Sequence, residues 1–243
     1  MDELQTYKTI LSFLINNHLK IIFFVISLSL FLICLKLLLK RREVKFLKRS
    51  SFYFLSSILS IFLLISIFYT LVPLFSIYYL FKGNSYISQN NIISAYKNYK
   101  KAYYLSPSDP GIISCLAYSS YYSNRFDESY SLLSRLYNSG KITPDLSILY
   151  SSLLLNSENM ELAKKNLDFA VKYVHDPTMA EFYLGKYYEL ENNLNKAEEH
   201  YLKALKGNKN FRQFILKNLL KFYEKTGELK KSQEILHEIK KDR

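Results

Sequence analysis

Histidines and adjacent carboxylates are the residues of this sequence whose types could do catalytic or metal chemistry. The histidines are His18, His175, His200 and His237. They are far apart in the chain, and none has a cysteine or carboxylate at a spacing typical of a metal site. Glu198 and Glu199 are adjacent on the outer face of an expected helix, where solvation explains them. With no glycine-rich phosphate loop and no nucleophile elbow, we expect no catalytic residues, metal or cofactor, and no enzyme.

Helices with small residues at regular positions are the elements that must position any site. The stretch from 180 to 210 holds two helical patterns separated by the polar segment 191–195. Leu184, Gly185 and Tyr188 share one face of the first helix, and Ala197, Tyr201 and Ala204 share one face of the second. Small residues let two helix backbones approach closely. The pattern predicts a helical hairpin.

The same pattern returns at a step of about 34 residues. The residues that occupy the repeated positions are Ala163, Ser129 and Ala95 for Ala197; Leu167, Leu133 and Tyr99 for Tyr201; Ala170, Leu136 and Ala102 for Ala204; and Ser151, Ala117 and Gly83 for Gly185. Toward the C-terminus the expected register slips by one residue, onto Leu220, Tyr223, Gly227, Ser232, Leu236 and Ile239. This recurrence predicts five hairpins from residue 76 to the end.

These residues and their spacing resemble the tetratricopeptide repeat, whose pattern has leucine-glycine, tyrosine, alanine, aromatic and alanine at these positions. The resemblance implies an all-α fold, with about five hairpins stacked into a right-handed solenoid over 76–243. One hairpin cannot bury its apolar face alone, so neighbouring units must cover it.

Two long apolar runs precede the repeats. We expect a tail or interfacial helix at 1–20, a transmembrane helix at 21–39, a basic loop at 40–51 and a second transmembrane helix at 52–75. Pro73 is expected to mark the joint between this span and the first repeat helix, with hardly any linker. Cys34 and Cys115 imply no disulfide framework.

The charge distribution predicts an orientation in the membrane. The formal net charge is +12, and lysines and arginines are dense in the loop 40–51, whereas the N-terminal flank has Lys8 and Lys20. Because basic loops stay in the cytoplasm, both chain ends are expected outside. This favours a bacterial cytoplasmic (inner) membrane protein with an extracytoplasmic repeat domain. No base-reading motif is present, so nucleic acid is not an expected partner.

In tetratricopeptide repeat proteins, the first helices of the hairpins line a concave groove that holds a peptide or partner helix. The resemblance implies these groove residues: Tyr118, Tyr121, Tyr122, Ile148, Ser152, Leu155, Phe182, Lys186, Glu189, Lys217 and Lys221. A mixed aromatic and basic lining suggests a peptide with apolar anchors and acidic groups. The alternative for Tyr118 and Tyr121 is that they only pack within the core.

The function predicted from the sequence is a membrane-anchored scaffold that presents the groove to a protein or peptide partner in an envelope assembly complex. The missing linker favours a membrane-associated partner. The alternative is a regulatory or transport-associated subunit with the repeat array in the cytoplasm. An enzyme with dispersed catalytic residues is a third interpretation.

Overall fold

The computed structural model describes residues 49–157 and 159–241, and isolated helical residues between 22 and 36. The expected tail 1–20, most of the expected span 21–39 and residues 40–48 of the basic loop lie outside the described residues. Every regular element of the two continuous ranges is a helix. The helices are α2 (Arg49–Ser88), α3 (Ile92–Leu105), α4 (Pro110–Tyr122), α5 (Phe126–Asn138), α6 (Pro144–Leu154), α7 (Met160–Tyr173), α8 (Thr178–Leu190), α9 (Leu194–Leu205), α10 (Lys209–Thr226) and α11 (Leu229–Lys241).

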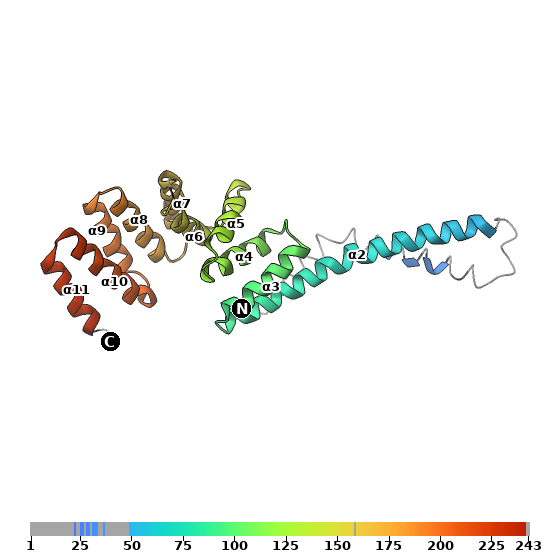
Figure 1. Ribbon diagram of the computed structural model, residues 1–243, viewed down its shortest axis with the longest axis horizontal. Coiled ribbons are helices and arrows are strands. Elements are labelled where there is room, and N and C mark those ends of the chain that lie inside the picture. The colour runs from blue at the N-terminus through green and yellow to red at the C-terminus, as the bar shows by residue number, and fades with distance from the viewer. Residues whose placement is uncertain are drawn as a thin grey trace.

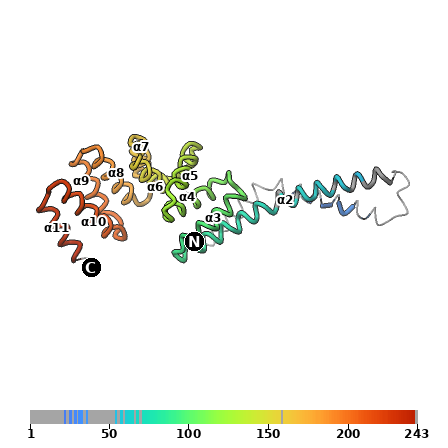
Figure 2. Tube along the Cα trace, viewed as in Figure 1, coloured from blue at the N-terminus to red at the C-terminus, as the bar shows by residue number. Residues whose placement is uncertain are grey.

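The helices pair along the chain into five hairpins, α2 with α3, α4 with α5, α6 with α7, α8 with α9 and α10 with α11. Contacts such as those of α3 with α4 and α7 with α8 join one hairpin to the next. Figure 1 shows the successive hairpins stacked in chain order, and the trace in Figure 2 follows the same curved course. The structure therefore confirms an all-helical solenoid of five hairpins for the described residues.

Asparagines in the left-handed backbone conformation end the first helix of three hairpins. Asn90, Asn124 and Asn192 have φ of 56°, 58° and 57°, which asparagine adopts more readily than most residues. The residue that follows each asparagine donates its N–H to a carbonyl five residues earlier; Asn193, for example, donates to Tyr188 at 2.8 Å. This pattern is a Schellman motif. The hairpin turn is thus repeated with the same local geometry.

Capping residues and prolines begin the first helices of the second and third hairpins. The Asp109 side chain accepts hydrogen bonds from two backbone N–H groups of α4, and the Thr143 hydroxyl accepts one from Leu146. Pro110 and Pro144 follow as the first helical residues. The backbone N–H at this position has no acceptor within the helix, so proline, which lacks an N–H, costs no hydrogen bond there. These signals fix where α4 and α6 start.

The recurring small residues lie where the two helices of a hairpin touch. The alanines among them, and the serines Ser129 and Ser151, have 0–1% of their surface exposed. A Cβ added at Gly185 would lie 2.6 Å from Cδ1 of Tyr201, and one added at Gly83 would lie 2.4 Å from Cε1 of Tyr99. Both distances are far below van der Waals contact. Glycine is therefore required at these two positions by the ring on the facing helix.

The last hairpin departs from the expected register. Leu219 and Ile235 are buried, whereas Leu236 is 41% exposed and Leu220 lies only partly buried beside the core. The expectation for Leu220 and Leu236 was therefore wrong, because at these two positions the buried residues, Leu219 and Ile235, lie 34 residues after Gly185 and Tyr201, without a slip. Ser232 and Ile239 are buried as expected.

Helix α2 is continuous across the expected joint at Pro73. The proline lies inside the helix, and the expected boundary between 75 and 76 is not a helix end. The C-terminal part of α2 packs on α3, with Ser76 Oγ donating to the Ala102 carbonyl at 3.3 Å. Figure 1 shows the N-terminal part extending away from the hairpins. Among the described residues, no helix has the length and apolar character needed to cross a membrane.

The contact between Gly185 and Tyr201 leads to a double-mutant prediction. Gly185→Ala should destabilise the fold by about 1–3 kcal/mol, because the added methyl overpacks a fully buried ring. In a Tyr201→Leu background the same substitution should be neutral or stabilising, since alanine favours a helix over glycine by about 1 kcal/mol. Thermal unfolding followed by circular dichroism measures both effects. An equal loss in the two backgrounds would contradict the contact.

Candidate partner-binding site

A pocket of about 770 Å³ opens on the side of the solenoid formed by the first helices of the hairpins. We call it the tyrosine pocket. Helices α4, α6, α8 and α10 contribute to it, as does the segment that joins α7 to α8. Its lining residues are Tyr118, Tyr121, Tyr122, Pro144, Asp145, Leu146, Ile148, Leu149, Tyr173, Val174, His175, Asp176, Met179, Tyr183, Phe211 and Phe214.

Aromatic rings supply much of this lining and are accessible. Tyr118 is 39% exposed, Tyr122 is 50% exposed and Phe214 is 46% exposed. The ring centroids of Tyr118 and Tyr122 are 4.6 Å apart. Partial burial, with Tyr118 and Tyr121 close by, raises the pKa of Tyr122 to about 12. The phenol is therefore neutral at physiological pH, and it can offer both a hydrogen-bonding hydroxyl and a ring face.

Tyr121 holds the centre of the pocket in place. Its hydroxyl accepts a hydrogen bond from Ser152 Oγ at 2.8 Å and lies 3.3 Å from the hydroxyl of Tyr183. These contacts connect α4, α6 and α8. Burial and the hydrogen bond with Tyr121 raise the pKa of Tyr183 above its ordinary value. The neutral hydroxyls thus join three consecutive hairpins across the pocket floor.

Asp176 fixes the loop at one edge of the pocket. Its Oδ1 accepts hydrogen bonds from the hydroxyl and the backbone N–H of Thr178, and its Oδ2 accepts one from Asn208 Nδ2 at 2.8 Å. Asn208 N–H donates in turn to the Thr178 hydroxyl at 2.8 Å. The hydrogen bonds from Thr178 and Asn208 lower the pKa of Asp176 below its ordinary value. This carboxylate joins the segment before α8 to the segment before α10.

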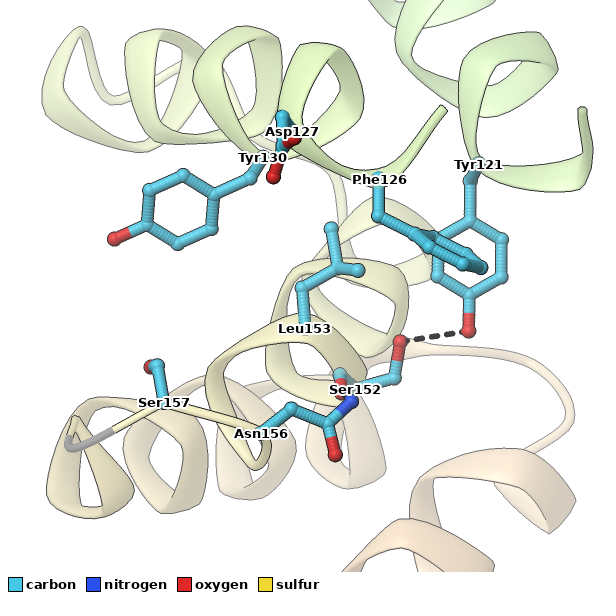
Figure 3. Close-up of a pocket in the computed structure, with 8 residues that line it drawn as sticks. All are labelled: Tyr121, Phe126, Asp127, Tyr130, Ser152, Leu153, Asn156 and Ser157. Atoms are coloured by element: carbon cyan, nitrogen blue, oxygen red, sulfur yellow. Dashed lines mark hydrogen bonds between the residues drawn. The ribbon is translucent and has the colours of Figure 1, made fainter. Parts of the chain in front are cut away.

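A second, smaller pocket of about 490 Å³ lies behind Tyr121, between α5 and α6. Figure 3 shows Phe126 beside Tyr121, and the dashed line marks the hydrogen bond between Ser152 and Tyr121. The two rings meet edge to face at 5.7 Å. Tyr121 therefore lines both pockets.

The structure brings some of the expected groove residues together and separates the others. Tyr118, Tyr121, Tyr122 and Ile148 line the tyrosine pocket, and Ser152 lines the smaller pocket. Leu155 and Phe182 are buried in the hydrophobic core. The charged candidates Lys186, Glu189, Lys217 and Lys221 lie outside the lining of both pockets.

Glu189 belongs to an ionic network away from the pockets. It accepts a hydrogen bond from the buried Tyr201 hydroxyl at 2.7 Å, and it pairs with Lys225 at 3.0 Å and Lys186 at 3.5 Å. Burial opposes ionisation, but these donors hold the pKa of Glu189 below its ordinary value. The network joins α8, α9 and α10, which gives Lys186 and Glu189 structural partners.

Other lining residues were not anticipated from the sequence. Tyr173, His175 and Asp176 come from the end of α7 and the loop after it, and Phe211 comes from the first turn of α10. The repeat step offers no signal for Phe211, because the position 34 residues before it is Pro177, which does not line the pocket. Loop conformation decides which of these side chains enter the pocket.

Metal-ligating residues do not cluster in the part of the chain that the structure describes. His200 has one carboxylate beside it: its Nδ1 lies 2.6 Å from Oε2 of Glu181. The imidazole also stacks on the ring of Tyr188, with centroids 5.2 Å apart. Both contacts hold α9 against α8.

The stacked hairpins and the pocket on their first helices define a tetratricopeptide repeat fold. YrrB, described as a TPR protein with an unusual peptide-binding site, has 20% sequence identity and a TM-score of 0.50, over 66% of this chain and 82% of YrrB. MamA from Desulfovibrio magneticus RS-1 has 14% identity and a TM-score of 0.55, over 68% of this chain and 93% of that protein.

A thermophilic TPR protein from Thermus thermophilus has 16% identity and a TM-score of 0.54, over 68% of this chain and 89% of that protein. At such low identity these similarities establish the fold. No protein-family model matches the sequence, and no curated protein matches it.

The bonds of Asp176 lead to a prediction about acid stability. Because its pKa is lowered in the folded state, its contribution is present at neutral pH and is lost as the pH falls below the ordinary value of 3.8. Asp176→Asn should therefore lower the melting temperature at pH 7, and the difference from the wild type should shrink toward about pH 3.

Asp145→Asn is the matched control, because no hydrogen bond or ion pair from a described residue reaches Asp145. It should leave the melting temperature at pH 7 nearly unchanged. A difference for Asp176→Asn that is constant from pH 7 to about pH 3 would contradict the role of the carboxylate charge.

Proposed function

We propose that the protein is a protein–protein interaction scaffold that binds a segment of a partner protein in the tyrosine pocket. The observation that carries the proposal is the accessible aromatic lining contributed by consecutive hairpins. Pockets that bind ligands are concave and mostly apolar, with a few placed polar groups. Aromatic residues also dominate binding hot spots. YrrB, a structure of the same fold, is described as having a peptide-binding site, which supports a peptide segment as the ligand.

The proposal includes attachment to a membrane through the N-terminal region. The sequence supports it: residues 50–81 contain no charged side chain, and a dense basic segment precedes them. Phe54 and Leu64 of α2 are 69% and 66% exposed. Since no described helix satisfies the requirements for a crossing, the proposed spans rest on the sequence alone. The charge of the basic segment supports an extracytoplasmic solenoid in an envelope assembly complex.

A cytoplasmic solenoid, acting as a regulatory or transport-associated subunit, is the second candidate. Lys97, Lys100 and Lys101 of α3 support it, because they bring positive charge close to the C-terminal end of the apolar run. The two candidates share the same pocket and differ in the side of the membrane on which it lies.

Photo-crosslinking in intact cells tests the scaffold. A benzoylphenylalanine placed at Tyr122 or at Phe214 should give a crosslinked adduct with a partner protein. The same residue at Tyr104, which is 72% exposed on α3 and outside the pocket lining, is the matched control and should not give that adduct. Equal adducts at all three positions, or none at the two pocket positions, would count against binding in the pocket.

Fractionation of cells tests membrane attachment. The full-length chain should remain with the membranes after alkaline carbonate extraction, because apolar spans are held by the bilayer and not by charge. A variant that begins at Ser76 should leave the membrane fraction. Recovery of the full-length chain in the supernatant would refute the anchor.

A cysteine introduced at Lys206 should react with an impermeant thiol reagent if the solenoid is extracytoplasmic.

A further inference from the structure

The charged groups of the tyrosine pocket are acidic. Asp145, from the first turn of α6, and Asp176, from the loop before α8, both line it. His175 also lines the pocket, and no lysine or arginine is among its described lining residues. The sequence had suggested a mixed aromatic and basic lining and a peptide with apolar anchors and acidic groups. The lining of the tyrosine pocket is aromatic but not basic, because the anticipated lysines lie outside it.

The two carboxylates differ in how much of their charge is compensated. Asp176 accepts hydrogen bonds from Thr178 and Asn208, which are neutral donors. Asp145 is exposed, and no hydrogen bond or ion pair from a described residue reaches its side chain. No described lysine or arginine forms an ion pair with either carboxylate, and His175 is the basic residue that acts on Asp176, so the negative charge of Asp145 is available to a ligand.

The tyrosine rings can add to the attraction of a cation. Elsewhere in the solenoid, lysines lie over tyrosine rings: Lys101 over Tyr79 at 5.3 Å and Lys196 over Tyr188 at 5.2 Å from the centroid. Such contacts are favourable because the ring face is electronegative. At the rim of the pocket, Lys172 lies over Tyr173 at 5.1 Å. No such contact from a described residue covers Tyr118 or Tyr122.

We propose that the tyrosine pocket selects a partner segment in which a lysine or arginine stands among apolar or aromatic residues. The apolar side chains occupy the surface formed by Met179, Phe211 and Phe214, and the cation lies between Asp145 and the rings of Tyr118 and Tyr122. This inference rests on the proposed function and specifies the chemistry of its ligand. An acidic segment would face repulsion from two carboxylates.

Selection from a random dodecapeptide phage library on the full-length protein in detergent tests the proposal. Bound sequences should be enriched in lysine or arginine together with aromatic or aliphatic residues, and depleted in aspartate and glutamate. The enriched peptide, labelled with a fluorophore, is then titrated by fluorescence anisotropy. Replacing its basic residue by glutamine should weaken binding about two- to fivefold, the range of an accessible ion pair.

Asp145→Asn should weaken binding of the selected peptide by the same factor, about two- to fivefold. It should not change the affinity of the peptide whose basic residue is replaced by glutamine. Asp127→Asn is the matched control. Asp127 is also the second residue of its helix and is exposed, and no hydrogen bond or ion pair from a described residue reaches it, but it lies outside the tyrosine pocket. It should leave the affinity of both peptides unchanged.

The outcomes separate this inference from the proposed function. Enrichment of acidic peptides, no preference in charge, or an equal effect of Asp145→Asn on both peptides overturns the inference and leaves peptide binding intact. No enrichment of any peptide, or enrichment that persists after Tyr118→Ala and Phe214→Ala together, counts against the pocket as a peptide site. Enrichment of basic peptides with sensitivity to Asp145 supports both.

Discussion

The close approach of the two helices within each hairpin is the constraint on which the rest of the structure depends. Tyr201 is fully buried because the facing residue, Gly185, has no side chain. Tyr99 is buried against Gly83 in the same way. In the second and third hairpins the equivalent positions hold a larger residue, Ala117 or Ser151, and the partner position holds the smaller Leu133 or Leu167. Volume is exchanged across the contact, so packing stays dense at each repeat.

Serine hydroxyls at this contact are buried, and hydrogen bonds offset the free-energy cost of burying them. Ser129 Oγ donates to the Ala117 carbonyl at 2.9 Å, and Ser151 Oγ shares its hydrogen between the Ser147 carbonyl at 2.7 Å and the Ala163 carbonyl at 3.1 Å. The contacts with Ala117 and Ala163 cross from one helix of the hairpin to the other. Because a buried hydroxyl without a partner is destabilising, these bonds let serine replace alanine at the contact. They also fix the axial position of one helix relative to its partner.

The periodic features of the sequence could be predicted, and the features that depend on individual loops could not. Small residues at a constant step indicated the hairpins, because close helix contacts tolerate few residue types. The groove residues expected on the first helices include Tyr118, Tyr121 and Tyr122, and these three line the tyrosine pocket. Phe182 was misplaced because one step around a helix moves a side chain from the groove to the core; its neighbour Tyr183 lines the pocket instead.

The charge of the pocket could not be predicted from the repeat pattern, for a related reason. Asp176 enters the pocket from a loop. The path of this loop is set by hydrogen bonds to Thr178, which is nearby in the sequence, and to Asn208, which belongs to the next hairpin. The lysines at groove positions were expected to face a ligand, yet Lys186 is paired with Glu189. Lys186 and Glu189 are one helical turn apart on α8, and Lys225 reaches the same carboxylate from α10, so the repeat position of a lysine does not decide what it contacts.

The continuity of α2 connects the N-terminal region to the pocket in a way that a flexible linker would not. The C-terminal part of this helix is fixed on α3 by the contact of Gly83 with Tyr99, and Tyr99 donates from its hydroxyl to Asn84 at 2.7 Å. The helix has 40 residues, which corresponds to about 60 Å. Its N-terminal part therefore has a set direction relative to the first hairpin. In the proposed membrane-attached scaffold, the surface that receives the exposed apolar side chains of α2 therefore also sets the orientation of the tyrosine pocket.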